Sequence, residues 1–381
     1  MTGNQHDAYF YEAFEEEAAA LKRFLPPKVH AGFTWQTVQE AGHAAPPAPL
    51  ISVRTQSQIP SGWGRVIDGV LTRSTGYDHI VAWIAALDAP IPAGYLPLYC
   101  NRAVAEQACL LWMALLRKLP QQVEQFARFH RDGITGFECR GRAITVFGVG
   151  NIGSEIVNIA RGLEMDVRGV DIVHRHKKVK YVKPREGLLH ADVLVCAMNL
   201  TADNDAYFNY DTLKLARPGT LFVNIARGEL SPSADLNRLL DEGILGGAGL
   251  DVYAHEKALA VALREGQSDR GCCPSHQGHS KEMLRQAQHD NSLNNSAIPA
   301  LSSRAKSRDL LPGNSPNHPD PCVATTLELA ARKNVITLPH NAFNTIEAVE
   351  RKAEQSMEAV AYFRRKKRFP YPVPNTTKEP L

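Results

Sequence analysis

Apolar and polar residues follow two periods along the chain, and the two periods alternate. Short apolar runs, typical of buried strands, lie at 29–33, 50–53, 66–71, 144–147, 167–170, 191–197, 221–225, 246–253 and 335–338. Apolar residues three or four positions apart predict helices at 12–24, 102–119, 156–163, 234–242 and 325–331, with a final helix opening at 339–341. Strands that alternate with helices predict parallel sheets. The pattern therefore indicates an α/β protein, with a smaller region before the long helix and a larger one after it.

One strand–turn–helix unit carries a phosphate-binding pattern. The run 144–147 leads into Gly148, Gly150 and Gly153, spaced as G-x-G-x-x-G, and the next strand ends in Asp171. The glycines permit a sharp turn, a close approach to a pyrophosphate and tight helix–strand packing. The helix amino terminus attracts phosphate, and the acid accepts hydrogen bonds from a ribose. The unit predicts a dinucleotide site.

Other polar residues follow later strands. Asn199, Arg227 and Asp251 each fall at the carboxyl end of a predicted strand of the larger region. Ligands of doubly wound sheets bind beyond the carboxyl ends of the strands, so these side chains are expected to converge on the dinucleotide site. The loop 72–79, which also follows a strand and contains a glycine, is a candidate binding loop.

The choice between NAD and NADP depends on the residues after Asp171. The stretch 174–178 is basic and could seat a ribose 2′-phosphate, although a solvated surface loop is the simpler interpretation. Because Asp171 would repel such a phosphate, the sequence favours NAD.

Size and charge narrow the class of protein. The chain has 381 residues, enough for two domains, and a net charge of +3, which gives no electrostatic case for nucleic acid or a membrane surface. No apolar run is long enough to span a bilayer, and the first residues contain no apolar signal core, so we expect a cytoplasmic protein. The seven cysteines are expected to be reduced, mostly buried thiols.

The composition changes between about 267 and 321. Cys272, Cys273, His276, His279 and His289 lie there among polar residues and proline, with one possible short helix at 281–289. Their spacing matches no tetrahedral zinc pattern, so we expect no metal and interpret the stretch as a low-complexity insertion.

Taken together, the motifs resemble the D-isomer-specific 2-hydroxyacid dehydrogenase family. The resemblance rests on the glycine pattern and on the stretches 223–228, 249–256 and 338–340, and it is strongest with D-lactate dehydrogenases through 73–79, 99–106 and 327–330. It covers nearly the whole chain except about 267–321. The resemblance implies two Rossmann-like domains: a doubly wound NAD-binding domain at 102–340, and a smaller flavodoxin-like substrate domain formed by 1–101 and 341–381.

The resemblance also implies roles for individual residues. His340 would be the acid/base, Glu256 would hold its imidazole, and Arg227 would polarise the keto group and orient the carboxylate. Substrate contacts would come from the backbone N–H groups of Gly76 and Tyr77, with Arg54 and Tyr99 as further candidates. The cofactor contacts would be Gly148, Gly150, Asn151, Ile152, Gly153, Asp171, Asn199, Ile225, Ala226, Arg227 and Asp251.

The implied activity is reduction of a small 2-keto acid by NADH, with pyruvate to D-lactate as the best match. The step from Glu256 to His340 is much longer than in the relatives, and we expect the insertion to loop out and leave the pair intact. Two alternatives stay open. One is a glyoxylate or hydroxypyruvate reductase, and the other is a non-catalytic NAD-sensing binding protein. Related proteins are usually homodimers, so a homodimer is expected by analogy.

Overall fold

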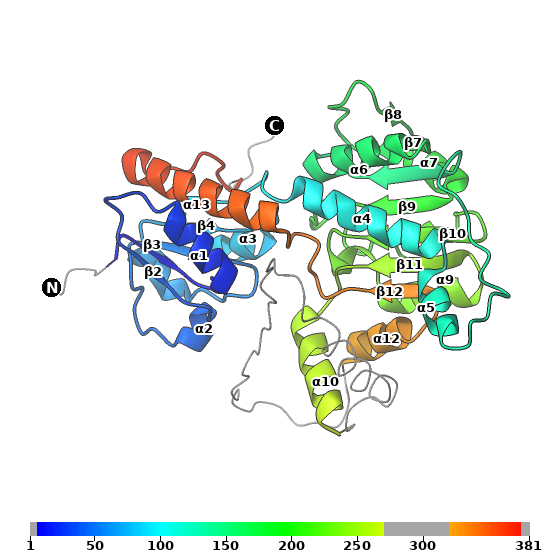
Figure 1. Ribbon diagram of the computed structural model, residues 1–381. Helices are drawn as coiled ribbons and strands as arrows, with labels where there is room; N and C mark the ends of the chain where they lie inside the picture. The colour runs from blue at the N-terminus through cyan, green and yellow to red at the C-terminus, as the bar shows by residue number, and fades with distance from the viewer. Residues whose placement is uncertain (1–5, 270–319, 375–381) are drawn as a thin grey trace, which may run out of the picture. The chain divides into compact units, whose positions relative to one another are not determined.

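A computed structural model describes residues 6–269 and 320–374 and contains two parallel sheets (Figure 1). The chain divides into two compact units. One unit, Met1–Ala254 with Glu328–Leu381, holds both sheets, and the other is His255–Leu327. The predicted α/β class with two parallel-sheet domains is confirmed.

The first sheet has five strands in the order β2-β1-β3-β4-β5, and every neighbouring pair is parallel. Its strands are β1 (Ala8–Phe10), β2 (Ala31–Phe33), β3 (Leu50–Val53), β4 (Gly69–Thr72) and β5 (Ala93–Gly94). The helices of this part are α1 (Glu15–Arg23), α2 (Val38–Ala41), α3 (Asp78–Ala85), α13 (Ile346–Lys366) and the 3-10 turn η1 (Ser61–Arg65). Helices α1 and α13 pack together, so the last helix of the chain completes the first sheet's domain.

Some details of this sheet differ from the sequence prediction. Strand β1 was not predicted, because a three-residue apolar run is too short to stand out from its surroundings. The strand predicted at 66–71 begins three residues later, since η1 reaches Arg65 and the Val66 side chain is 61% exposed. The short strand β5 was not predicted either, whereas the change at β4 is a shift at an element end, where sequence patterns are least informative.

The second sheet has seven strands in the order β12-β11-β10-β9-β6-β7-β8, again all parallel. Its strands are β6 (Ala143–Phe147), β7 (Asp166–Val170), β8 (Lys180–Tyr181), β9 (Val193–Cys196), β10 (Thr220–Asn224), β11 (Leu245–Leu250) and β12 (Val335–Thr337). The helices of this part are α4 (Asn101–Leu116), α5 (Leu119–Phe126), α6 (Asn151–Gly162), α7 (Pro184–His190), α8 (Tyr210–Leu213), α9 (Ser233–Asp241), the 3-10 turn η2 (Gly228–Leu230) and α12 (Pro321–Ala330).

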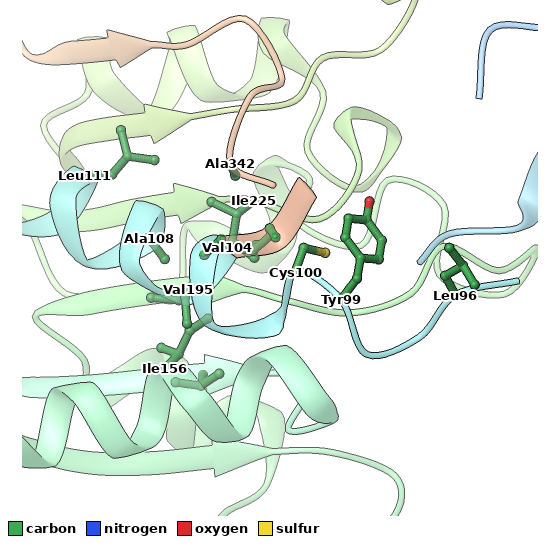
Figure 2. Close-up of a cluster of buried hydrophobic side chains, with 14 of the residues drawn as sticks. Leu96, Tyr99, Cys100, Val104, Ala108, Leu111, Ile156, Val195, Ile225 and Ala342 are labelled. Carbon is green, nitrogen blue, oxygen red and sulfur yellow. The ribbon is translucent and has the colours of Figure 1, made fainter. Parts of the chain in front are cut away.

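Helices cover both faces of the second sheet. On β9, Val193 and Val195 join the core under α4 and α6, whereas Leu194 and Cys196 join the core on the opposite face. Successive strand residues point to opposite faces, so this division requires two apolar layers. Figure 2 shows the first layer, where Val104, Ala108 and Leu111 of α4 lie close to Ile156 and Val195. This double covering explains why the strands read as continuous apolar runs.

Some sequence predictions concern features outside the two sheets. The helix predicted at 102–119 is two helices, because Lys118 has a left-handed backbone (φ 51°) that ends α4 and starts α5. The five described cysteines are free thiols. Among the helices of the described ranges, none is both long enough and apolar enough to cross a membrane. Cys272, Cys273, His276, His279, His289 and the possible helix at 281–289 lie outside the described residues.

Candidate active site

The glycine-rich turn after β6 has the geometry that a dinucleotide requires. Gly148 has φ +88°, and a Cβ atom there would lie 2.7 Å from the carbonyl oxygen of Ala197. A Cβ atom on Gly153 would overlap the carbonyl of Gly148, whereas a Cβ position on Gly150 faces open space. The chain therefore needs glycine at two positions for packing, and leaves room at the third, beside the amino terminus of α6, where a pyrophosphate would lie.

Asp171 connects the turn to the neighbouring strand end. Its carboxylate accepts hydrogen bonds from the backbone N–H of Val149 at 2.6 Å and of Val173 at 2.9 Å. The acid thus stands at the carboxyl ends of β6 and β7, where a ribose would reach it. In the basic stretch that follows, the His174 ring stacks on Tyr181 with centroids 4.1 Å apart. This stacking gives one of its basic residues a packing role within the protein.

Asn224, the buried last residue of β10, stabilises the turn that follows this strand at the carboxyl edge of the second sheet. Its side-chain amide donates to the carbonyl oxygen of Arg227 and to the Ser231 hydroxyl, both at 2.8 Å. Its side-chain oxygen accepts from the backbone N–H of Ala226 at 3.0 Å. Ile225 is buried and Ala226 is half-buried in this turn. The fold therefore presents the Arg227 side chain from a backbone fixed by one asparagine.

Arg227 reaches the loop after β4, which belongs to the first sheet. Its Nε and Nη2 donate to Asp78 Oδ1 at 3.3 and 3.1 Å. Burial alone raises the pKa of Asp78, but the nearby Arg227 guanidinium and hydrogen bonds outweigh burial and leave that pKa below its usual value. A Cβ atom on Gly76 would overlap the guanidinium in this position, so glycine lets Arg227 lie against the backbone of this loop.

The same loop offers free backbone donors. In the described part of the chain, the N–H groups of Gly76 and Tyr77 have no protein acceptor. They precede helix α3 and lie next to the permanent positive charge of Arg227. Amide donors beside a guanidinium form a suitable binding place for a carboxylate. The structure thus brings together three residues, Gly76, Tyr77 and Arg227, that the sequence analysis predicted from separate motifs.

His340 lies in a loop that a buried carboxylate holds. Fully buried Asp251, directly after β11, accepts from the backbone N–H groups of Asn341 at 3.0 Å and of Ala342 at 2.9 Å. His340 itself has φ +52°, a left-handed conformation that histidine tolerates better than most residues. Its ring meets the Phe343 ring edge-on, with centroids 6.3 Å apart. Asp251 therefore orients the predicted acid/base through the backbone, in addition to any contact with a cofactor.

The prediction that a helix opens at 339–341 is wrong. Helix α13 begins at Ile346. Thr345 caps its amino terminus, because the Thr345 hydroxyl oxygen accepts a hydrogen bond from the backbone N–H of Ala348 at 3.2 Å. The left-handed backbone of His340 cannot belong to a right-handed helix. Residues 339–345 are therefore a loop, which agrees better with a catalytic role than a helical position would.

Glu256 is the first residue of helix α10 (Glu256–Asp269) in the second compact unit. The residue before it, His255, pairs with Asp320 through Nδ1 and Oδ2 at 2.5 Å. Asp320 is the first described residue after 269, and this contact pairs it with the residue that precedes helix α10. The predicted partnership between Glu256 and His340 stays a prediction, because the two residues belong to different units.

The remaining predicted cofactor residues lie near the same strand ends. Asn151 and Ile152 open helix α6, and the Asn151 side chain donates weakly to the carbonyl oxygen of Pro97 at 3.4 Å. Asn199 is exposed after β9, and its carbonyl oxygen accepts from the Asn204 side chain at 2.8 Å. These three residues are placed where a dinucleotide could contact them, and their roles stay predictions.

The two further substrate candidates lie among charged and aromatic side chains. The Arg54 guanidinium lies 4.7 Å from the centroid of the Phe343 ring. Tyr99 is buried beside Lys352, whose Nζ lies 5.7 Å from its ring centroid. Burial raises the pKa of the Tyr99 hydroxyl well above its usual value, so this group stays protonated.

Sequence reasoning missed several residues that build the site, namely Glu17, Arg73, Asp78, Asn224, Lys352 and the aromatic Phe343. Asp78 lies inside the loop that the sequence marked as a candidate, and Phe343 follows the predicted histidine by three positions. Glu17 and Lys352 gave no such signal, because each is one charged residue on a helix whose other charges are exposed or half-buried.

Comparison with known families identifies part of the chain. The model for "D-isomer specific 2-hydroxyacid dehydrogenase, NAD binding domain" matches residues 109–288. The D-lactate dehydrogenase of Streptococcus agalactiae serotype V is 31% identical over 210 residues, which are 53% of this chain and 63% of that protein. The glyoxylate reductase of Pyrococcus furiosus is 30% identical over 202 residues, 49% of this chain and 60% of that protein. The matches thus span less than two thirds of these relatives.

Comparison with solved structures extends the similarity in fold to nearly the whole chain. D-lactate dehydrogenase from Aquifex aeolicus, crystallised with NAD and lactic acid, has a TM-score of 0.68 at 21% identity. The alignment covers 94% of this chain and 96% of that one. The two-sheet architecture of this chain is therefore shared with that solved structure.

Proposed function

We propose that this protein is an NAD-dependent oxidoreductase. It belongs to the D-isomer specific 2-hydroxyacid dehydrogenase family through the NAD-binding domain, which is matched at residues 109–288. Its substrate class is the small 2-keto acids and the corresponding D-2-hydroxy acids. Pyruvate, reduced to D-lactate, is the simplest member, and the similarity to a D-lactate dehydrogenase supports it.

One observation carries the proposal. The Arg227 guanidinium packs on the backbone of Gly76, next to the unused N–H groups of Gly76 and Tyr77. Arg227 follows β10 of one sheet, whereas Gly76 follows β4 of the other. A carboxylate bound there would place its keto group at the carboxyl edge of the NAD-binding sheet. This is the arrangement that reduction of a 2-keto acid needs.

The chain's own residues account for the proton and charge steps. Bound NADH supplies the hydride. As charge develops on the keto oxygen, Arg227 stabilises it and His340, as imidazolium, donates the proton. Asp251 holds the loop that carries the histidine. Glu256, by our proposal, holds the second imidazole nitrogen and favours the charged ring, since an opposite charge stabilises it.

The domain division, subunit number and compartment are parts of the same proposal. We assign substrate binding to 1–101 with 341–381, and cofactor binding to 102–340. Val123, Phe126 and Phe129 on and after α5 are 65–76% exposed, and such an apolar group supports a homodimer. The five described free thiols support a reducing compartment, the cytoplasm.

The glyoxylate reductase of Pyrococcus furiosus, at 30% identity, supports a second candidate: reduction of glyoxylate or hydroxypyruvate. Arg54 and Tyr99, which line the predicted substrate side, would decide between the two. A non-catalytic NAD-sensing protein is the third possibility. Against it, Arg227 is held in a position to bind a carboxylate, a feature that a pure cofactor sensor does not need.

The test is oxidation of NADH and NADPH over a panel of pyruvate, glyoxylate, hydroxypyruvate and phenylpyruvate. We expect turnover with NADH, with a kcat/KM for NADPH lower by about tenfold or more because Asp171 repels the 2′-phosphate. Binding of NADH without oxidation by any keto acid would instead favour the sensor. The stereochemistry of the product, measured with a D-specific assay, completes the test.

A further inference from the structure

We propose that Arg54 binds a second carboxylate on the substrate, so that the enzyme prefers 2-keto dicarboxylic acids to 2-keto monocarboxylic acids of equal chain length. This inference rests on the proposed function, since it names the substrate class of the same site. It assigns the reacting carboxylate to Arg227 and Gly76, and the distal carboxylate to Arg54.

The Arg54 head group is fixed in place by two aromatic rings. Its guanidinium carbon lies 5.4 Å from the centroid of Phe14 and 4.7 Å from that of Phe343. A planar guanidinium stacked on rings keeps its edge available for a bidentate carboxylate. The side chain is 17% exposed, so it is partly desolvated and still reachable. An ion pair formed there would be stronger than one on the open surface.

The surrounding charges do not balance. Glu17 is the carboxylate shared by three cations: it lies 2.8 Å from Arg73, 2.9 Å from Lys352 and 4.0 Å from Arg54. Glu17, Arg73 and Lys352 are almost fully buried. Burial alone raises the pKa of Glu17, yet the three cations bring it to about 2, so it is ionised. One negative charge therefore faces three basic groups.

The nearest other buried acid does not correct this balance. Glu12 accepts hydrogen bonds from the backbone N–H groups of Arg54, Gln56 and Ser57, at 2.8, 3.1 and 3.2 Å. Its carboxylate is therefore committed to the backbone of the turn after β3. The turn presents the Arg54 side chain much as Asn224 presents Arg227.

The Arg54 donors are also unused. The Arg73 guanidinium donates hydrogen bonds to Glu17, to the Ser52 hydroxyl and to the carbonyl oxygen of Tyr11. By contrast, within residues 6–269 and 320–374 the Arg54 guanidinium has no hydrogen-bond acceptor, and its ion pair with Glu17 is at the 4.0 Å limit. A partly buried cation with open donors and excess positive charge around it is suited to an anion from outside the protein.

The position of Arg54 connects it to the reacting groups. Phe343, on which Arg54 stacks, lies in the same loop as His340, and their rings are in edge-on contact. Asp251 fixes this loop by accepting from Asn341 and Ala342. A substrate whose keto group faces His340 would therefore extend its far end past Phe343 toward Arg54. A charged far end fits these surroundings better than an alkyl or aryl end.

The experiment compares keto acids that differ only in the distal group. The values of kcat/KM are measured for 2-ketoglutarate against 2-ketopentanoate and for oxaloacetate against 2-ketobutyrate, with NADH in excess. For at least one pair we expect the dicarboxylate to be favoured by about tenfold or more. In Arg54→Gln this preference should be lost, a fall of about tenfold or more, since one charge-assisted contact is removed. Arg54→Lys, which keeps the charge without the planar fork, should give an intermediate value.

Controls separate specificity from general damage. Arg65→Gln removes an exposed arginine of the same sheet domain, which pairs with Asp88, and should leave the preference unchanged. An unchanged preference in Arg54→Gln, or no preference in the native protein, overturns the inference while leaving the proposed function intact. An equal loss for both members of a pair also overturns it, because Arg54 would then bind the carboxylate next to the keto group.

The inference has a readout that does not need turnover. If no keto acid oxidises NADH, the proposed function fails, and binding of 2-ketoglutarate and 2-ketopentanoate to the NADH-loaded protein is measured by calorimetry. Tighter binding of 2-ketoglutarate that Arg54→Gln abolishes would support the second-carboxylate site. Equal binding of the two acids to the native protein would overturn it.

Discussion

Arg227 and Arg54 stand at equivalent places in the two sheets, and their surroundings differ. Each follows the carboxyl end of a parallel strand, β10 for Arg227 and β3 for Arg54. Arg227 donates twice to Asp78 and packs on Gly76. Arg54 stacks between two phenylalanine rings and shares one distant carboxylate with two other cations. One arginine is bound to the protein by hydrogen bonds, and the other is held by packing.

This difference suits the two arginine side chains to the two different tasks that we propose for them. Hydrogen bonds fix both the position and the direction of Arg227, as stabilisation of a developing oxyanion requires. Stacking fixes the position of Arg54 and leaves its donors open, as recognition of a variable group requires. The loop 339–345 serves both arginines, with His340 near the reacting end and Phe343 under Arg54.

The largest effect is expected at the first arginine. Arg227→Gln should lower kcat/KM by about a thousandfold for every keto acid, because the oxyanion loses its only proposed permanent cation. The matched control is Arg238→Gln, which removes an exposed arginine of the same sheet domain. A loss confined to dicarboxylates would mean that Arg227, and not Arg54, binds the distal carboxylate, which contradicts the roles proposed for the two arginines. The measurement is steady-state NADH oxidation, with circular dichroism to confirm the fold.

The next largest effect is expected at the loop between them. His340→Asn should lower kcat by about a hundredfold or more at pH 7, since the proton donor is lost. Asparagine is chosen because it tolerates the left-handed backbone at this position, which alanine would strain. Binding of NADH, followed by fluorescence, should be retained. Turnover close to the native value would remove His340 from the mechanism.

A smaller effect concerns the buried cluster under Arg54. Burial lowers the pKa of Lys352 from its usual value to about 8. Between this value and the higher pKa of an unfolded lysine, the unfolded chain binds more protons, so the free energy of unfolding should rise with pH. From pH 8 to 9.5 the rise should be about 1–2 kcal/mol relative to Lys352→Met, which lacks the group.

This stability difference is measured by urea unfolding at both pH values, with Lys366→Met as the control, because Lys366 is exposed on the same helix. The control should behave as the native protein does. If Lys352→Met has the same pH dependence as the native protein, Lys352 keeps its proton in the fold. The cluster under Arg54 would then keep its three positive charges up to a higher pH than we infer.

The smallest effect is expected from the stretch outside both regions. Deleting 270–318 should leave kcat/KM within about twofold, because loop length contributes little free energy. The His255–Asp320 pair lies outside the deleted residues and is retained in this variant. A large loss of activity, with the fold retained, would show that these residues take part in the site and that Glu256 depends on them.

The sequence predicted most of the residues that lie at the carboxyl ends of the strands in the seven-stranded sheet. Gly148, Gly153 and Asp171 lie where the motif placed them, because each answers a local demand of a strand, a turn or a helix start. Arg227, Gly76 and Tyr77 were also predicted, through resemblance to a known family. The loop geometry of His340 was missed, since a buried acid ninety positions earlier in the chain, Asp251, fixes that loop.

By itself, then, the amino-acid sequence determined the class of fold and the dinucleotide turn, and it predicted the residues that we propose to react. Periodicity, glycine spacing and residue chemistry are local properties, and they can be read one segment at a time. Only the tertiary structure decided that Glu17, Arg73 and Lys352 share one buried cluster and that Arg54 is left with open donors. Charge balance in a low-dielectric interior depends on which side chains meet, and three separate segments of the chain supply them.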